Sequence, residues 1–94
     1  MRIELVYFPG CPHVAAARAA LREALARSGL PATWTERDTT HEATPPEYRR
    51  HASPTVLVDG VDVEGKPPVS GGSCAVGGGP SVERLLAALA AAAH

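Results

Sequence analysis

Two cysteines, Cys11 and Cys74, are the side chains of this sequence best suited to nucleophilic or redox chemistry. Cys11 lies within FPGCPH at positions 8–13, between a β-rich run and a segment of strong helix formers. The unpaired N–H groups at the start of a helix favour a thiolate over a thiol, and they can lower a cysteine pKa from about 8.5 to roughly 3.5–7.5. Cys11 is therefore either an activated nucleophile or a buried, inert cysteine at the end of a strand.

Two further features bear on the chemistry of Cys11. His13 follows it by two residues, where an imidazolium could stabilise a thiolate or protonate a leaving thiol. The other interpretation of His13 is an exposed side chain in the first helical turn. Ser53-Pro54-Thr55 precedes a predicted hairpin, and an X-Pro bond at such a place can be cis. Zinc is not expected, because a structural site needs four ligands and the histidine spacing does not supply them.

Hydrophobic periodicity and turn residues predict the elements that must position these side chains. We expect a buried strand at residues 2–8, closed by Pro9-Gly10, and then a helix at 13–28 with Pro12 in its first turn and Gly29 just past its end. A strand at 32–37 follows, with Trp34 as a packing residue, and then a short helix that starts at Pro45-Pro46 and ends near residue 52.

The second half of the chain is predicted to hold a hairpin, a long loop and a helix. The hairpin strands are expected at 55–58 and 61–64, on either side of Asp59-Gly60. Residues 66–80 form a loop rich in Gly and Pro that carries Cys74, and the last helix is capped by Ser81, with Leu85 and Leu89 in its apolar stripe. The order β-α-β-α-β-β-α indicates an α/β fold with a central mixed four-stranded sheet flanked by helices.

Length and composition limit the functional classes. With 94 residues the chain is expected to form a single domain over residues 1–94. The net charge is −1 with no block of like charge, so neither nucleic acid nor an anionic membrane is an expected partner. No transmembrane helix or signal peptide is expected. Two cysteines without an export signal indicate a cytoplasmic protein whose cysteine chemistry is reactive rather than architectural.

The motif around Cys11 and the Ser53-Pro54-Thr55 segment together resemble the thioredoxin-like superfamily, and the resemblance covers most of the chain. It implies a thioredoxin-like fold in which Cys11 is the nucleophile and Pro54 is cis and faces it. The substrate groove would be lined by the residues beside these two, Pro12, His13, Ser53, Pro54 and Thr55. The sequence looks most like a small glutaredoxin-like protein with a single active-site cysteine, because the Gly-Gly-Ser-Cys run at 71–74 resembles the Gly-Gly-Cys turn of glutaredoxins.

The sequence also departs from the family pattern. The Cys-x-x-Cys motif is replaced by Cys11-Pro12-His13-Val14, so a disulfide within the motif is impossible. Cys74 is followed by Ala75-Val76 in place of acidic residues, and no lysine lies near Cys11, which weakens the expectation of glutathione binding. We expect no cofactor.

Three functions remain open at this point. The first is a thiol-disulfide oxidoreductase acting on a small-molecule or protein substrate, with Cys11 as nucleophile and Cys74 as a possible resolving thiol. The second is a carrier in which Cys11 and Cys74 hold a soft metal ion, and the chain also resembles sequences encoded alongside mercury-resistance functions. The third is a thioredoxin-like scaffold without chemistry, since a fold alone does not determine function.

Overall fold

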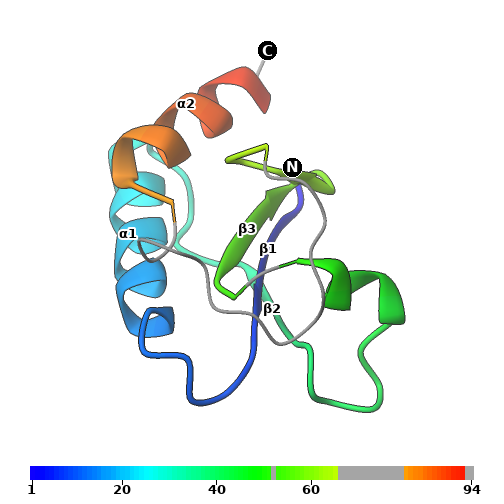
Figure 1. Cartoon of the computed structure of the whole chain (residues 1–94). Helices are drawn as coiled ribbons and strands as arrows, with labels where there is room; N and C mark the ends of the chain where they lie inside the picture. The colour runs from blue at the N-terminus through cyan, green and yellow to red at the C-terminus, as the bar shows by residue number, and fades with distance from the viewer. Residues whose placement is uncertain (52, 66–79, 93–94) are drawn as a thin grey trace.

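The computed structural model describes residues 1–51, 53–65 and 80–92 (Figure 1). Its elements follow the predicted order, with the short helix in 3-10 geometry. They are β1 (Ile3–Tyr7), α1 (Val14–Arg27), β2 (Thr35–Asp38), the 3-10 helix η1 (Pro46–Arg50), β3 (Thr55–Val58), β4 (Val61–Asp62) and α2 (Val82–Ala92). The described chain is thus an α/β structure.

The four strands form one mixed sheet in the order β2-β1-β3-β4. β1 is parallel to β2, with Glu4 opposite Thr35, and antiparallel to β3, with Val6 opposite Thr55. β3 continues into β4 as an antiparallel hairpin. The prediction of a mixed four-stranded sheet is confirmed, and β1 and β3 are its two inner strands.

The two α-helices pack against each other on the same face of the sheet, and η1 lies on the other side (Figure 1). The main core lies between the helices and the sheet, where fully buried leucines of α1 and α2 meet Leu5 of β1 and Val56 of β3. Burying an aliphatic side chain of this size stabilises the fold by roughly 1.5–3 kcal/mol. The opposite face carries a smaller cluster of Val6, Leu57 and Tyr48. We expected helices on both faces of the sheet. In the described chain both α-helices cover one face, and the short η1 lies on the other.

Helix α1 (Val14–Arg27) begins one residue later and ends one residue earlier than the predicted range of 13–28. His13 is its N-cap residue, so Pro12 precedes the helix and does not lie in its first turn as expected. At the other end Gly29 has a φ of +71°, and Leu30 and Gly29 donate to the carbonyls of Leu25 and Ala26. This pattern is a Schellman motif, and it needs a residue that adopts the left-handed conformation without strain.

Two strands differ from their predicted ranges: β2 begins later, and β4 ends earlier. β2 begins at Thr35 rather than at residue 32, because its pairing with β1 starts only at Glu4. β4 ends at Asp62 rather than at residue 64, because the Asp62 side chain accepts the N–H of Glu64 and its carbonyl accepts that of Gly65. These bonds turn the chain away from the sheet at that point.

The turn between β3 and β4 has the geometry that Asp59-Gly60 predicts. Asp59 and Gly60 have φ values of +52° and +83°, as a type I′ turn requires. Asp59 also exchanges two hydrogen bonds of 2.7 Å with the backbone of Arg2, one through its N–H and one through Oδ1. The turn is thereby fixed to the residue that precedes β1.

Within the described ranges no helix has the length and apolar character that a membrane crossing requires.

Candidate functional site

Cys11 lies in the loop that connects β1 to α1. Its N–H donates to the carbonyl of Phe8 over 3.4 Å, and this bond closes a turn in which Gly10 has a φ of +89°. Pro followed by a residue of positive φ at the two central positions is the pattern of a type II turn. The Cys11 carbonyl then accepts the N–H of Val14, the first residue of α1. Cys11 therefore precedes the helix by three residues and lies outside the first helical turn, where the effect of the helix dipole is strongest.

The structure brings Cys11 together with the segment that begins at Ser53. The Cys11 sulfur donates to the Ser53 carbonyl oxygen over 3.5 Å, and the Ser53 hydroxyl oxygen accepts the N–H of Phe8 over 3.2 Å. The Ser53-Pro54 peptide bond is cis. Ser53, Pro54 and Thr55 are all buried, while Cys11 retains an exposed fraction of 7%. The antiparallel pairing of β1 with β3 places these two segments side by side.

The other expected site residues lie at different depths. Pro12 is exposed and His13 is half-buried at the N-cap of α1, where its side chain makes no capping hydrogen bond. Cys74, predicted as a resolving thiol or as a second metal ligand, lies outside the described residues, as does the whole run at 71–74. In the part of the chain that the structure describes, no group of three or more His, Cys, Asp or Glu side chains could hold a metal ion.

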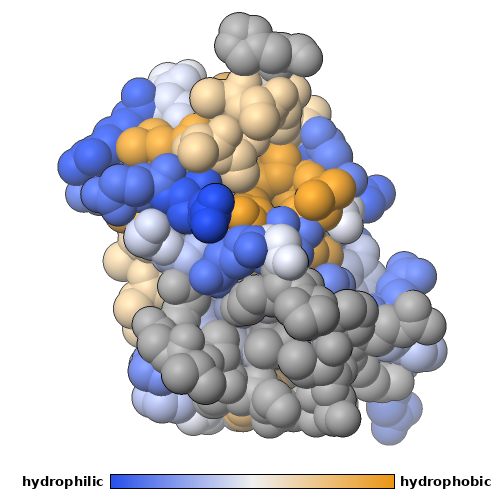
Figure 2. All heavy atoms as spheres, turned by 45° about the horizontal axis from the view of Figure 1, so that its top comes forward, coloured by the Kyte–Doolittle hydropathy of each residue, from blue (hydrophilic) through white to orange (hydrophobic). Residues whose placement is uncertain are grey.

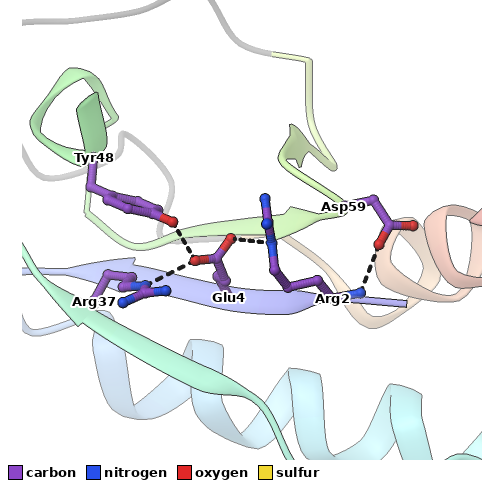
Figure 3. A network of polar contacts seen from close by, with 5 residues as sticks. All are labelled: Arg2, Glu4, Arg37, Tyr48 and Asp59. Atoms are coloured by element: carbon purple, nitrogen blue, oxygen red, sulfur yellow. Dashed lines mark hydrogen bonds and ion pairs between the residues drawn. The ribbon is translucent and has the colours of Figure 1, made fainter. Parts of the chain in front are cut away.

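A second polar cluster lies on the face of the sheet away from the α-helices. Glu4 of β1 has an exposed fraction of 0%, and its Oε2 accepts hydrogen bonds from the Tyr48 hydroxyl over 2.5 Å and from Nε of Arg37 over 2.9 Å (Figure 3). Oε1 lies 3.2 Å from Nε of Arg2 as an ion pair, but receives no hydrogen bond from the described residues. The Arg37 guanidinium also lies 5.0 Å from the centre of the Tyr48 ring.

These partners determine how Glu4 titrates. Burial alone would raise the pKa of the Glu4 carboxyl, but hydrogen bonds from Tyr48 and Arg37 and the charge of Arg2 together hold it below its ordinary value. The hydrogen bond to Glu4 in turn raises the pKa of Tyr48. Glu4 is thus a buried carboxylate paired with cations, which suits it to connecting elements of the fold.

A third cluster joins α1 to β2. Arg18 binds both carboxylate oxygens of Glu36, at 2.8 and 2.9 Å, and its guanidinium lies 5.2 Å from the centre of the Tyr7 ring. Trp34 packs partly against the main core and donates its indole N–H to Glu36 over 3.2 Å. The structure therefore gives Trp34 the packing role that the sequence predicted.

The sequence analysis did not identify the cluster around Glu4. The available signal was a single charged residue inside an otherwise apolar strand, between Ile3 and Leu5. A charge in such a place is costly to bury without partners. Its partners Arg37 and Tyr48 are 33 and 44 residues away in sequence, so periodicity gave no means of finding them.

A groove lies at the other end of the sheet from Cys11. It has a volume of about 380 Å³ and separates the β3-β4 hairpin from the last turns of α2. Figure 2 shows apolar side chains gathered on this face, and the lining residues include Val58, Val61, Val63, Ala88 and Ala91. The groove contains neither Cys11 nor Ser53. We take the Cys11 turn as the candidate functional site because it carries the thiol.

The arrangement at Cys11 combines a thiol, a tight turn and a buried backbone segment from a distant strand. A thiol held in this way can form and break bonds to sulfur once it loses its proton. Comparisons with known protein families, with curated proteins and with solved structures found no match for this chain.

Proposed function

We propose that this protein is a thiol-disulfide oxidoreductase of thioredoxin-like fold, with Cys11 as its nucleophile. The observation that carries the proposal is the contact of 3.5 Å between the Cys11 sulfur and the carbonyl oxygen of Ser53, the residue before Pro54. These are the two segments that the resemblance to the thioredoxin-like superfamily requires to face each other. A contact between residues 42 positions apart depends on the whole β1-β3 pairing.

The topology supports the same proposal. A parallel strand pair joined by a helix, followed by an antiparallel hairpin in the same sheet, is the arrangement that the resemblance implies. Cys11 occupies the loop at the carboxyl end of β1, and in open α/β sheets the loops at that end commonly carry the functional groups.

The proposed reaction exchanges one disulfide for another. The Cys11 thiol loses its proton, and the thiolate attacks one sulfur of a substrate disulfide. A bond forms between Cys11 and that sulfur, the substrate S–S bond breaks, and the second substrate sulfur leaves as a thiolate and takes up a proton. A second thiol then attacks the Cys11 sulfur of the mixed disulfide and releases the remaining substrate thiol. We propose Cys74 for this step, which leaves the substrate reduced and the two protein cysteines oxidised.

Return to the starting state requires a donor of two electrons, for which we propose a cellular dithiol or two molecules of a low-molecular-weight thiol. Such a donor is abundant in a reducing compartment, in agreement with the expected cytoplasmic location. The exposed Pro12 and the half-buried His13 flank Cys11 on the helix side, where an incoming disulfide would contact them. Ser53-Pro54-Thr55 would form the opposite wall.

The test measures exchange with an aromatic disulfide that releases a coloured thiolate. The reduced wild-type protein should release it rapidly, and Cys11→Ser should lose this rapid release and retain only the slower reaction of Cys74 with the reagent. Cys74→Ser is the matched control, since it removes the other thiol and leaves Cys11; it should accumulate a mixed disulfide at Cys11 that peptide mass spectrometry detects. Full activity in Cys11→Ser would overturn the proposal, and absence of the adduct in Cys74→Ser would remove Cys74 from the second step.

A further inference from the structure

Ser53 contacts both ends of the turn that carries Cys11. Its hydroxyl oxygen accepts the N–H of Phe8 over 3.2 Å, where the turn begins, and its carbonyl oxygen accepts the Cys11 sulfur proton over 3.5 Å, where the turn ends. The exposed fraction of Ser53 is 2%, so water cannot readily replace either bond. A single buried residue thus holds two points of a surface turn.

The turn itself is closed by its own backbone. One hydrogen bond, from the Cys11 N–H to the Phe8 carbonyl, closes it, and Pro9 and Gly10 at its centre are both exposed. Ser53, by contrast, is followed directly by the buried Pro54 and by Thr55, which pairs with Val6 in the sheet. Ser53 therefore links the start of a paired inner strand to a turn whose two central residues are exposed.

We infer that Ser53 is a positioning residue for Cys11, acting through the hydrogen bonds of its hydroxyl and carbonyl oxygens to opposite ends of the Phe8–Cys11 turn. The sulfur is held with its proton directed at a carbonyl oxygen, and ionisation removes the donor of that bond. Ser53 therefore restrains the position of the Cys11 sulfur until a substrate displaces the contact. The inference rests on the proposed function of Cys11 as the reacting thiol.

This role differs from the one that the resemblance implied for Ser53. A substrate-binding residue presents a polar group to the ligand, whereas here the hydroxyl and carbonyl oxygens both bind groups of this chain. Replacing the hydroxyl should therefore act on the turn. It leaves the Phe8 N–H without its acceptor and loosens the Cys11 sulfur from the Ser53 carbonyl.

The experiment measures the rate at which iodoacetamide alkylates Cys11 in the reduced protein, by peptide mass spectrometry at a single pH. Ser53→Ala should raise the rate by about three- to tenfold, the range that one neutral hydrogen bond supports. Ser53→Thr keeps the hydroxyl and should stay within about twofold of the wild type. Tyr48→Phe, which removes a buried hydroxyl on the other face of the sheet, should also leave the rate unchanged.

An unchanged rate in Ser53→Ala would overturn the inference, and so would an equal rise in Tyr48→Phe, because general loosening would then explain both. If Ser53→Ala fails to fold, amide hydrogen exchange in the wild-type protein decides instead. The Phe8 amide should be strongly protected, and exchange as fast as in an unstructured peptide would overturn the inference. Alkylation does not require disulfide exchange, so a failure of the proposed function would appear separately in the Cys11→Ser activity.

Discussion

Tyr48 and Glu4 are 44 positions apart in the chain, and the hydroxyl oxygen of Tyr48 lies 2.5 Å from Oε2 of Glu4. This bond joins η1 to the inner strand β1. Arg37 of β2 donates to the same carboxylate oxygen, so three elements meet at one buried atom. The face of the sheet that lacks the α-helices is thus held by a polar centre as well as by the small apolar cluster of Val6, Leu57 and Tyr48.

The first prediction concerns the strength of this centre. Tyr48→Phe removes one donor to a buried carboxylate and should lower the free energy of unfolding by about 1–3 kcal/mol, measured by urea denaturation. Glu4→Gln and the double variant complete a thermodynamic cycle, in which the two effects should fall short of additivity by about 1 kcal/mol or more. Simple additivity would show that the short contact contributes nothing specific to stability.

The second prediction concerns how the free energy of unfolding changes at acidic pH. The pKa of Glu4 in the folded protein lies below its ordinary value of 4.5, although burial opposes this, because Tyr48, Arg37 and Arg2 stabilise the charged form. A carboxyl with a lowered folded pKa stabilises the fold fully above its unfolded pKa, and the stabilisation is lost as the pH falls through the folded value. Glu36, whose hydrogen bonds to Arg18 also lower its pKa against the effect of burial, should act in the same direction.

Unfolding free energies of the wild type should therefore stay nearly constant above about pH 5 and decline as the pH is lowered from about 5 to about 3. Glu4→Gln should be less stable at neutral pH, because it leaves Arg37 and Arg2 near an uncharged group, and should decline less steeply on acidification. Glu36→Gln is the control, because it removes the charge of a carboxylate whose ion pair with Arg18 is partly exposed. A wild-type and a Glu4→Gln curve that run parallel would contradict the assignment of the acid response to Glu4.

The third prediction separates stability from reactivity by means of two glycines. Gly29 ends α1 and Gly10 lies in the Cys11 turn, both have positive φ, and an added Cβ at either would meet no atom within 4 Å. Each alanine substitution should therefore cost about 1–2 kcal/mol through backbone strain alone. Gly10→Ala should also change the rate of Cys11 alkylation, whereas Gly29→Ala should lower stability and leave that rate unchanged. Equal alkylation rates in the two variants would show that the turn does not control the thiol.

Local patterns predicted the elements that depend on near neighbours. Asp59-Gly60 predicted the hairpin turn because its residues tolerate positive φ, and Ser81 predicted the start of α2, where its hydroxyl accepts the N–H of Arg84 over 3.2 Å. Gly29 predicted the end of α1 for the same conformational reason. In each of these places the information lies within a few residues.

The parts that the sequence did not reveal depend on contacts between distant segments. The residues next to Glu4 in the sequence do not indicate that Arg37 and Tyr48 are its partners. The residues next to Cys11 likewise do not indicate that Ser53 is its hydrogen-bond acceptor. The resemblance to a known family led us to expect Cys11 and Pro54 to face each other, but not the bond from Phe8 to the Ser53 hydroxyl. The start of β2 likewise depended on where β1 begins, which composition does not encode.

The position of β1 as an inner strand has a consequence for synthesis on the ribosome. Its parallel partner β2 ends at Asp38 and β3 begins only at Thr55, so β1, α1 and β2 can associate before β3 has emerged. The antiparallel partner β3, with Ser53 at its start, arrives later and must close a loop of about fifty residues. The nascent chain therefore exposes the Cys11 thiol to the surrounding redox environment before the pairing that buries it can form.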